Sequence, residues 1–270
     1  MKRSLSVFFF LCFSSFLLAF PAFSSRLVSG SHAVSFDSGK TEEDKAESGK
    51  TEESKAESGR MEKTEEKKEE EEEAKLLAAT KTSEKTKQII LKLDHRLSLW
   101  NKGEDGRWKK AAEYYSGHGR NGFKKAEERR EGDGTTPIGS FPILFSFGQG
   151  DKPETEMSYR RISRNSYWSS GRKDYNSWVE SGKKIEGEHL IEYPICYQYA
   201  MAVGFNQNPA VFGRGSAIFL HIKAPDSWES SGCITLEKEA LLELLRLCRD
   251  GCCILLLPPS EAANTASSRV

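Results

Sequence analysis

Two side chains that could carry out acyl chemistry lie within one stretch of this chain. An apolar run over residues 217–220 leads directly to His221, and after a mostly polar, turn-prone spacer Cys233 follows Ser231 and Gly232. A thiol becomes an effective nucleophile when a neighbouring imidazole takes its proton, so Cys233 and His221 form a candidate nucleophile and base. Gly232 permits a sharp bend beside the sulfur, where backbone N–H groups can stabilise a developing oxyanion.

The spacing alone does not establish catalysis. A cysteine and a histidine that are near each other in sequence carry no signature that transfers between protein families, and such pairs are usually coincidental. The pair therefore needs support from the motifs around it.

Several of those motifs resemble one family. The run GSAIFLH over residues 215–221, followed by the Ser-Gly-Cys box, is similar to the catalytic core of the L,D-transpeptidase (YkuD-type) family, in particular to one branch of it. Residues 119–122 (GRNG), 130–141 (REGDGTTPIGSF) and 188–194 (EHLIEYP) resemble further segments of that family. The resemblance implies a cysteine acyltransferase that acts on the stem peptides of peptidoglycan through a Cys233 thioester, with His221 as the base and with no metal or organic cofactor.

The chain departs from the family pattern at three places. Ser231 stands where many members have a second histidine, Ile222 where many have glycine, and Thr235 where an arginine commonly follows the cysteine. One contact to a substrate carboxylate is therefore missing. We expect another cation to replace it, with Arg160, Arg161 and Arg214 as the candidates.

The segment 145–188 is rich in aromatic residues and arginine and shows poor periodicity, so it is predicted to be a long irregular insertion. Exposed aromatic rings can stack on sugar faces and arginine can hold a carboxylate through two hydrogen bonds. Tyr167, Trp168 and Arg160 are therefore expected to bind substrate, together with Arg214. His189, just after this segment, is included with them, although a structural role for that histidine is the simpler alternative.

The flanking elements predict a mainly β fold with one or two helices, and the family resemblance implies a β-sandwich. Residues 87–93, 96–100 and 107–115 alternate as three strands of a meander. Residues 237–247 form an amphipathic helix pattern, and 252–257 form a buried strand that ends at two prolines.

The chain divides into four regions by composition. Residues 1–25 combine a basic start, an apolar centre and a small-residue end, as in a signal peptide. Residues 26–86 contain Glu/Lys-rich ten-residue repeats typical of a disordered linker. Residues 87–258 are predicted to form the catalytic domain, and residues 259–270 a disordered tail. The protein is thus expected to be secreted or associated with the cell wall or periplasm, and to contact the membrane only if the signal segment stays uncleaved.

Charge and cysteine content narrow the function classes. Forty basic residues balance forty acidic ones, so the global charge gives no argument for nucleic-acid binding. Six cysteines, without paired CxxC or histidine motifs, argue against a structural zinc site and leave disulfide pairing open. We expect a monomer whose partner is peptidoglycan.

Two rival functions remain open at this stage. The first is a thiol carboxypeptidase or amidase that acts on wall fragments and uses the same Cys233 and His221. The second is a non-catalytic wall-binding module that keeps the fold for its groove. An adhesin or spacer dominated by the Glu/Lys repeats is disfavoured, because more than half of the chain has the pattern of a folded domain.

Overall fold

The computed structural model describes residues 60–61 and 63–258. The predicted signal peptide, most of the predicted linker and the predicted tail lie outside the described residues. Within the described part, no helix is long and apolar enough to cross a membrane. Cys196, Cys233, Cys248, Cys252 and Cys253 are all free thiols.

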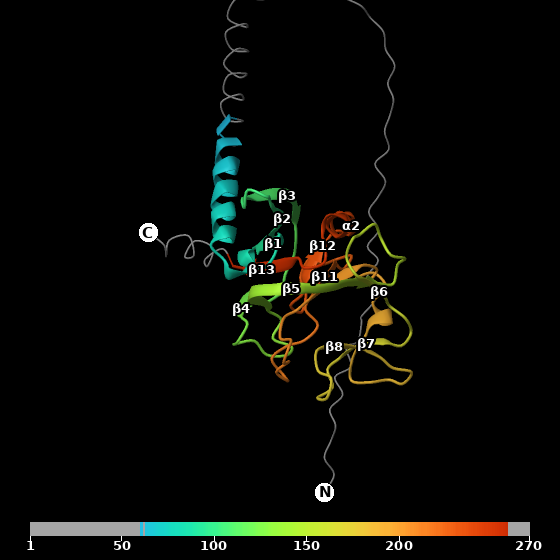
Figure 1. The fold of residues 1–270 in the computed structure, drawn as a ribbon. Coiled ribbons are helices and arrows are strands. Elements are labelled where there is room, and N and C mark those ends of the chain that lie inside the picture. The colour runs from blue at the N-terminus through green and yellow to red at the C-terminus, as the bar shows by residue number, and fades with distance from the viewer. Residues whose placement is uncertain (1–59, 62, 259–270) are drawn as a thin grey trace, which may run out of the picture. The chain divides into compact units, whose positions relative to one another are not determined.

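One ten-stranded sheet forms the body of the domain, which confirms the predicted mainly β fold. Eight strands follow one another in the order β12-β11-β10-β5-β13-β1-β2-β3, and β4 and β6 pair with β5 beside this path (Figure 1). The strands are β1 Gln88–Leu93, β2 Arg96–Lys102, β3 Trp108–Tyr115, β4 Phe123–Lys125, β5 Thr136–Gly148, β6 Tyr159–Arg161, β10 Ala200–Val203, β11 Phe219–Ile222, β12 Ile234–Leu236 and β13 Cys253–Leu257. The predicted meander corresponds to β1, β2 and β3.

The long strand β5 joins the two halves of this sheet. Its residues 139–142 pair with β13, while Ile143 to Phe147 pair with β10, which carries a register shift between Ala202 and Val203. Because β5 belongs to both halves, the sheet can curl so that its two ends cover each other.

The core lies between the curled ends of the sheet. It unites Ile90 and Leu99 of the β1–β2 end with Leu220 and Ile234 of the β11–β12 end. Helix α2 (Lys238–Leu247) fills the remaining space through buried residues spaced three and four apart, which are Leu241, Leu244 and Leu245. This is the amphipathic helix that the sequence predicts.

The segment predicted as an irregular insertion contains a small sheet of its own. Strands β7 (Ser166–Ser169), β8 (Ser177–Glu180) and β9 (Gly187–His189) pair antiparallel in the order β8-β7-β9, and η2 (Leu190–Glu192) follows. Trp168 and Phe219 meet edge to face at 4.8 Å, so this small sheet packs against β11. The insertion therefore lies directly beside β11, the strand that carries His221.

Ordered structure begins before residue 87, where the sequence predicts a disordered linker up to residue 86. A helix covers residues 63–78, and η1 (Lys81–Glu84) connects it to β1. Leu76 and Leu77 are buried against β1 and β2, and Glu73 pairs with Arg96 and Lys110. Burying each leucine contributes about 1.5–3 kcal/mol, which offsets the cost of ordering this otherwise polar segment.

Candidate functional site

Two parallel strands position the candidate nucleophile and base. Strands β11 and β12 pair with His221 opposite Thr235 and Leu220 opposite Ile234, so Cys233 stands immediately before β12. Cys233 packs against the core cluster that contains Phe219, and the ring of Tyr197 in the same cluster meets the His221 ring edge to face at 5.5 Å. The thiol and the imidazole therefore border the same side of β11.

The thiol of Cys233 is held by the backbone of the preceding strand. Its Sγ donates a hydrogen bond to the Ala217 carbonyl at 3.2 Å and accepts one from the Phe219 N–H at 3.4 Å. Among the described residues, these are the partners of Sγ, and His221 is not one of them. Burial, and then the nearby Glu188 carboxylate, raise the pKa of this thiol to about 12, so the resting thiol is protonated at neutral pH.

His221 is held as a neutral ring. Its side chain is 8% exposed, and burial lowers its pKa. Nδ1 lies 2.8 Å from the Ile222 carbonyl oxygen. Because a carbonyl oxygen can only accept, Nδ1 carries the proton of the neutral ring and Nε2 keeps its lone pair for proton transfer.

A tyrosine and a carboxylate connect the two groups. The Tyr197 hydroxyl donates to Glu188 Oε2 at 2.7 Å, while its ring contacts His221. Burial raises the pKa of Glu188, and burial together with Glu188 and Cys233 raises the pKa of Tyr197 well above its ordinary value. Tyr197 thus contacts both the His221 ring and the Glu188 carboxylate.

A cavity of about 310 Å³ opens onto Cys233. Its charged lining residues are Arg129, Glu131 and Glu188. The Arg129 side chain is 3% exposed, and its Nη2 binds Asp133 Oδ1 at 2.9 Å. In the part of the chain that the structure describes, Nη1 of Arg129 is buried and has no hydrogen-bond partner. A buried N–H without a partner is costly, so Nη1 is a donor whose hydrogen-bonding capacity is unmet within the described residues.

The Ser-Gly-Cys box forms a tight loop beside this cavity. Gly232 has φ +139°, and a Cβ at this position would lie 2.7 Å from the Thr135 carbonyl oxygen, so only glycine fits. The Gly232 N–H donates to Ser230 Oγ at 3.0 Å. One of the backbone donors that the sequence predicts for an oxyanion is therefore already in a hydrogen bond. Ser231 lines the cavity, and its Oγ accepts a hydrogen bond from Arg120 Nη1 at 2.9 Å.

Of the expected substrate-binding residues, Trp168 lines the cavity. Tyr167 instead stacks on His189 at 4.3 Å, and His189 is held by Glu192 and the Arg164 carbonyl. Neither Tyr167 nor His189 lines the cavity at Cys233, and the structural role of His189 stays a prediction.

The expected replacement cations lie elsewhere. The Arg160 guanidinium covers the Phe145 ring at 3.7 Å, and Arg161 pairs with Asp151. Neither they nor Arg214 line the cavity at Cys233. The cation that does so is Arg129, which immediately precedes the REGDGTTP motif. Its position beside that motif is the sequence signal that could have identified Arg129 as a cavity residue. Glu188 has a similar signal, because it is the first residue of the EHLIEYP motif.

The match to known proteins decides the family. A family model described as the YkuD L,D-transpeptidase catalytic domain matches residues 86–256. The chain belongs to this family. The L,D-transpeptidase resemblance of the sequence motifs is thereby confirmed. No match is found among curated proteins.

Solved structures give weaker similarities. The helical cell shape determining protein Pgp2 of Campylobacter jejuni is 17% identical with a TM-score of 0.38, and the match covers 66% of this chain and 53% of that chain. L,D-transpeptidase 1 of Mycobacterium tuberculosis is 14% identical with a TM-score of 0.30, covering 63% and 60%. The Ldtfm–avibactam carbamoyl enzyme is 16% identical with a TM-score of 0.31, covering 64% and 49%. The chain spans less than two thirds of each of these proteins, and the family assignment rests on the family model.

Proposed function

We propose that the protein is an exported cysteine acyltransferase that acts on peptidoglycan stem peptides. The observation that carries this proposal is a cavity lined by both Cys233 and Arg129, whose buried Nη1 has no hydrogen-bond partner among the described residues. Membership of the catalytic-domain family supports the acyl chemistry. The signal-peptide pattern of residues 1–25 supports export to the compartment where peptidoglycan lies.

The reaction begins with both catalytic groups uncharged. Nε2 of His221 takes the thiol proton as Sγ of Cys233 attacks a peptide carbonyl carbon. The C–N bond then breaks, the imidazolium returns the proton to the departing amine, and a thioester remains on Cys233. An incoming amine attacks that thioester, gives up a proton to His221 and regenerates the thiol. The donor is a tetrapeptide stem, and the acceptor is a side-chain amine of a neighbouring stem.

Arg129 supplies the contact that the family pattern places after the cysteine. Its guanidinium is always charged, and one of its nitrogens is already fixed by Asp133. Nη1 is left to bind a carboxylate or carbonyl oxygen of the stem peptide. Glu131 and Glu188 give the same cavity an acidic side, which suits an ammonium group of donor or acceptor.

Product analysis tests the proposal. The protein is incubated with a disaccharide tetrapeptide, with and without an acceptor amine, and the products are resolved by mass spectrometry. We expect a cross-linked or amine-exchanged product that requires Cys233. Trimmed stems that form equally well without the amine would assign the same site to the thiol carboxypeptidase alternative, and the absence of any product from folded protein would favour the wall-binding module.

A further inference from the structure

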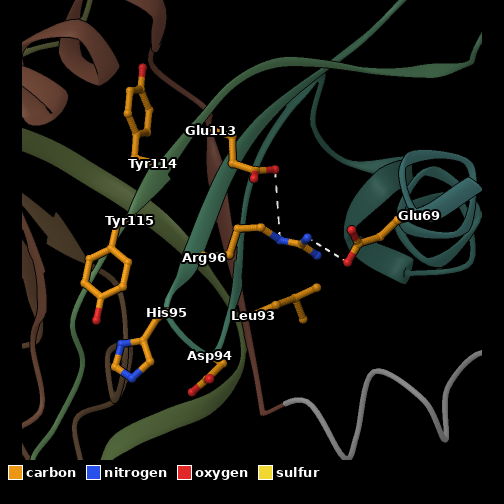
Figure 2. Close-up of a pocket in the computed structure, with 8 residues that line it drawn as sticks. All are labelled: Glu69, Leu93, Asp94, His95, Arg96, Glu113, Tyr114 and Tyr115. Carbon is orange, nitrogen blue, oxygen red and sulfur yellow. Dashed lines mark ion pairs between the residues drawn. The ribbon is translucent and has the colours of Figure 1, made fainter. Parts of the chain in front are cut away.

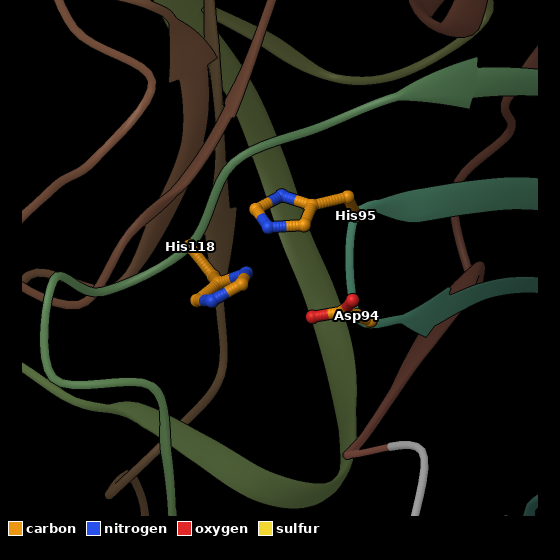
Figure 3. A group of neighbouring side chains, drawn as sticks. All are labelled: Asp94, His95 and His118. Carbon is orange, nitrogen blue, oxygen red and sulfur yellow. The ribbon is translucent and has the colours of Figure 1, made fainter.

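A second group of reactive side chains lies away from the Cys233 cavity. Asp94 and His95 form the turn between β1 and β2, and His118 follows β3. One ligand atom from each of the three residues lies within 4.8 Å of those of the other two. Figure 3 shows the carboxylate and the two imidazole rings turned toward a common space.

The local contacts leave these donor atoms available. Nδ1 of His95 lies 3.2 Å from the Ser116 carbonyl oxygen, which leaves Nε2 as its free nitrogen. Nδ1 of His118 is buried and has no hydrogen-bond partner among the described residues. The Lys92 amine donates to the Asp94 and Ser116 carbonyl oxygens, so it is directed at the backbone rather than at the three donors.

Two of the three residues are exposed, and charges of both signs surround the group, including the buried Lys92. Asp94 and His95 are exposed and line a cavity of about 690 Å³ that Glu69 and Glu113 also border (Figure 2). Arg96 in the same cavity is paired with both glutamates. A cation can therefore approach Asp94 and His95 from solvent, while His118 is half-buried and does not line this cavity.

We propose that Asp94, His95 and His118 bind one divalent transition-metal ion, with zinc as the best fit. Two neutral imidazoles and one carboxylate form a donor set typical of this ion, with a fourth position left for water. The absence of paired cysteine and histidine motifs in the sequence argues against a structural zinc site of the usual kind. These ligands come from a two-residue turn and from a segment more than twenty residues later.

A bound ion would also brace the loop that carries Cys233. Around His118, Gly117 pairs with Thr235 and Gly119 pairs with Ser230. The Ser230 N–H donates to the His118 carbonyl at 3.1 Å. His95 stacks on Tyr115 at 5.2 Å, and Tyr115 meets Trp228 edge to face at 4.7 Å. The metal would thus fix the β1–β2 turn to both sides of the Ser-Gly-Cys loop.

Zinc affinity of the full chain tests the site. Zn²⁺ is titrated into the protein against a chromophoric chelator, and one equivalent is expected to bind. Asp94→Asn, His95→Gln and His118→Gln should each raise the Kd by at least about tenfold. Asn tolerates the φ of 48° at position 94, so the first variant preserves the turn. His189→Gln is the control, because His189 pairs with Glu192 and is not one of the three ligands, and it should leave the Kd unchanged.

Cobalt separates this site from cysteine ligation. Co²⁺ at Asp94, His95 and His118 should give only the weak bands of nitrogen and oxygen ligands, whereas a strong thiolate charge-transfer band would overturn the assignment. A wild-type chain that binds no equivalent of Zn²⁺ would overturn the assignment. So would a Kd equal to that of the wild type in the exposed-residue variants Asp94→Asn and His95→Gln. Slower amide exchange at Arg120 and Ser230 on adding Zn²⁺ is expected from the bracing, and unchanged exchange would contradict that part. None of these readouts depends on acyl transfer.

Discussion

The two cavities contain similar charged groups in opposite settings. Around Cys233, Arg129 is nearly fully buried and is fixed by Asp133, while Glu188 is fixed by Tyr197. In the cavity lined by Asp94 and His95, Glu69 and Arg96 form an ion pair at 2.6 Å with side chains 53% and 29% exposed. In the first cavity Arg129 is buried, Glu188 is half-buried and Glu131 is exposed, whereas the second cavity is open to water.

This difference determines what each cavity can do. Buried charges interact strongly and can hold a reacting group in one orientation, but removing one partner strands the other. Exposed charges contribute little to stability and leave donors free for an ion from solution. We therefore expect substitutions at the Cys233 cavity to affect folding and chemistry together, and substitutions at the other cavity to affect little besides metal binding.

The largest effect is expected from Arg129→Met. The change removes the buried charged partner of Asp133, whose pKa is held well below its usual range by Arg129 and neighbouring N–H and hydroxyl donors against the opposing effect of burial. Losing one partner of a buried pair costs about 3–5 kcal/mol in the free energy of unfolding, and binding of the stem peptide should fall with it. Urea unfolding and acylation rates measure the two effects.

The neighbouring arginine is the control for that change. Arg130 is exposed, and Arg130→Met should cost less than about 0.5 kcal/mol. Equal losses for the two variants would remove the distinction between a buried and a surface cation. Arg129→Lys, which keeps the charge, then separates the loss of geometry from the loss of charge.

A smaller loss is expected from Gly232→Ala. The added Cβ would contact the Thr135 carbonyl oxygen, and φ +139° disfavours any other residue, so the strain should cost about 1–3 kcal/mol. Gly213→Ala also introduces a residue at positive φ but meets no atom within 4 Å. Thermal unfolding should show the greater loss for Gly232→Ala, and the reverse order would mean that the Cys233 loop can shift freely.

The pH dependence of thiol alkylation sharpens the same comparison. Since burial and Glu188 raise the pKa of Cys233 to about 12, its thiolate fraction should increase about tenfold per pH unit from pH 7 to 10. A free thiol with a pKa of about 8.5 would instead level off above pH 9. Iodoacetamide labelling followed by peptide mass spectrometry measures the rate, and a plateau near neutral pH would indicate a preformed thiolate–imidazolium pair.

The smallest effect is expected from Glu69→Gln in the exposed cavity. Its ion pair with Arg96 is exposed to water, and such pairs contribute about 0.2–1 kcal/mol. Urea unfolding should place the variant within that range of the wild type. A loss comparable to that of Arg129→Met would show that the helix over residues 63–78 depends on charge more than on Leu76 and Leu77.

The sequence predicted what depends on local patterns. Alternating apolar residues located β1 to β3, and the spacing of Leu241, Leu244 and Leu245 located α2. The Ser-Gly-Cys box and His221 are near each other in sequence, so the curled sheet brings them together through adjacent strands.

Contacts between segments that are far apart in the chain could not be predicted from the sequence. Arg129 and Cys233 are about a hundred residues apart, and nothing in either segment shows that both line one cavity. The helix over residues 63–78 was missed for a different reason. Its two buried leucines follow a run of glutamates, and the composition is dominated by residues that usually stay solvated.

The central claim is that Cys233 is the acyl-accepting nucleophile, and the intact mass of a covalent adduct tests it most directly. Wild type, Cys233→Ala and Cys196→Ala are each treated with a carbapenem acylating probe and with a tetrapeptide muropeptide. Cys196 is the matched control, because it packs against the same core cluster as Cys233 and burial also raises its pKa. We predict one adduct on wild type and on Cys196→Ala, and none on folded Cys233→Ala. An adduct that persists without Cys233, or its absence from folded wild type, would contradict the account.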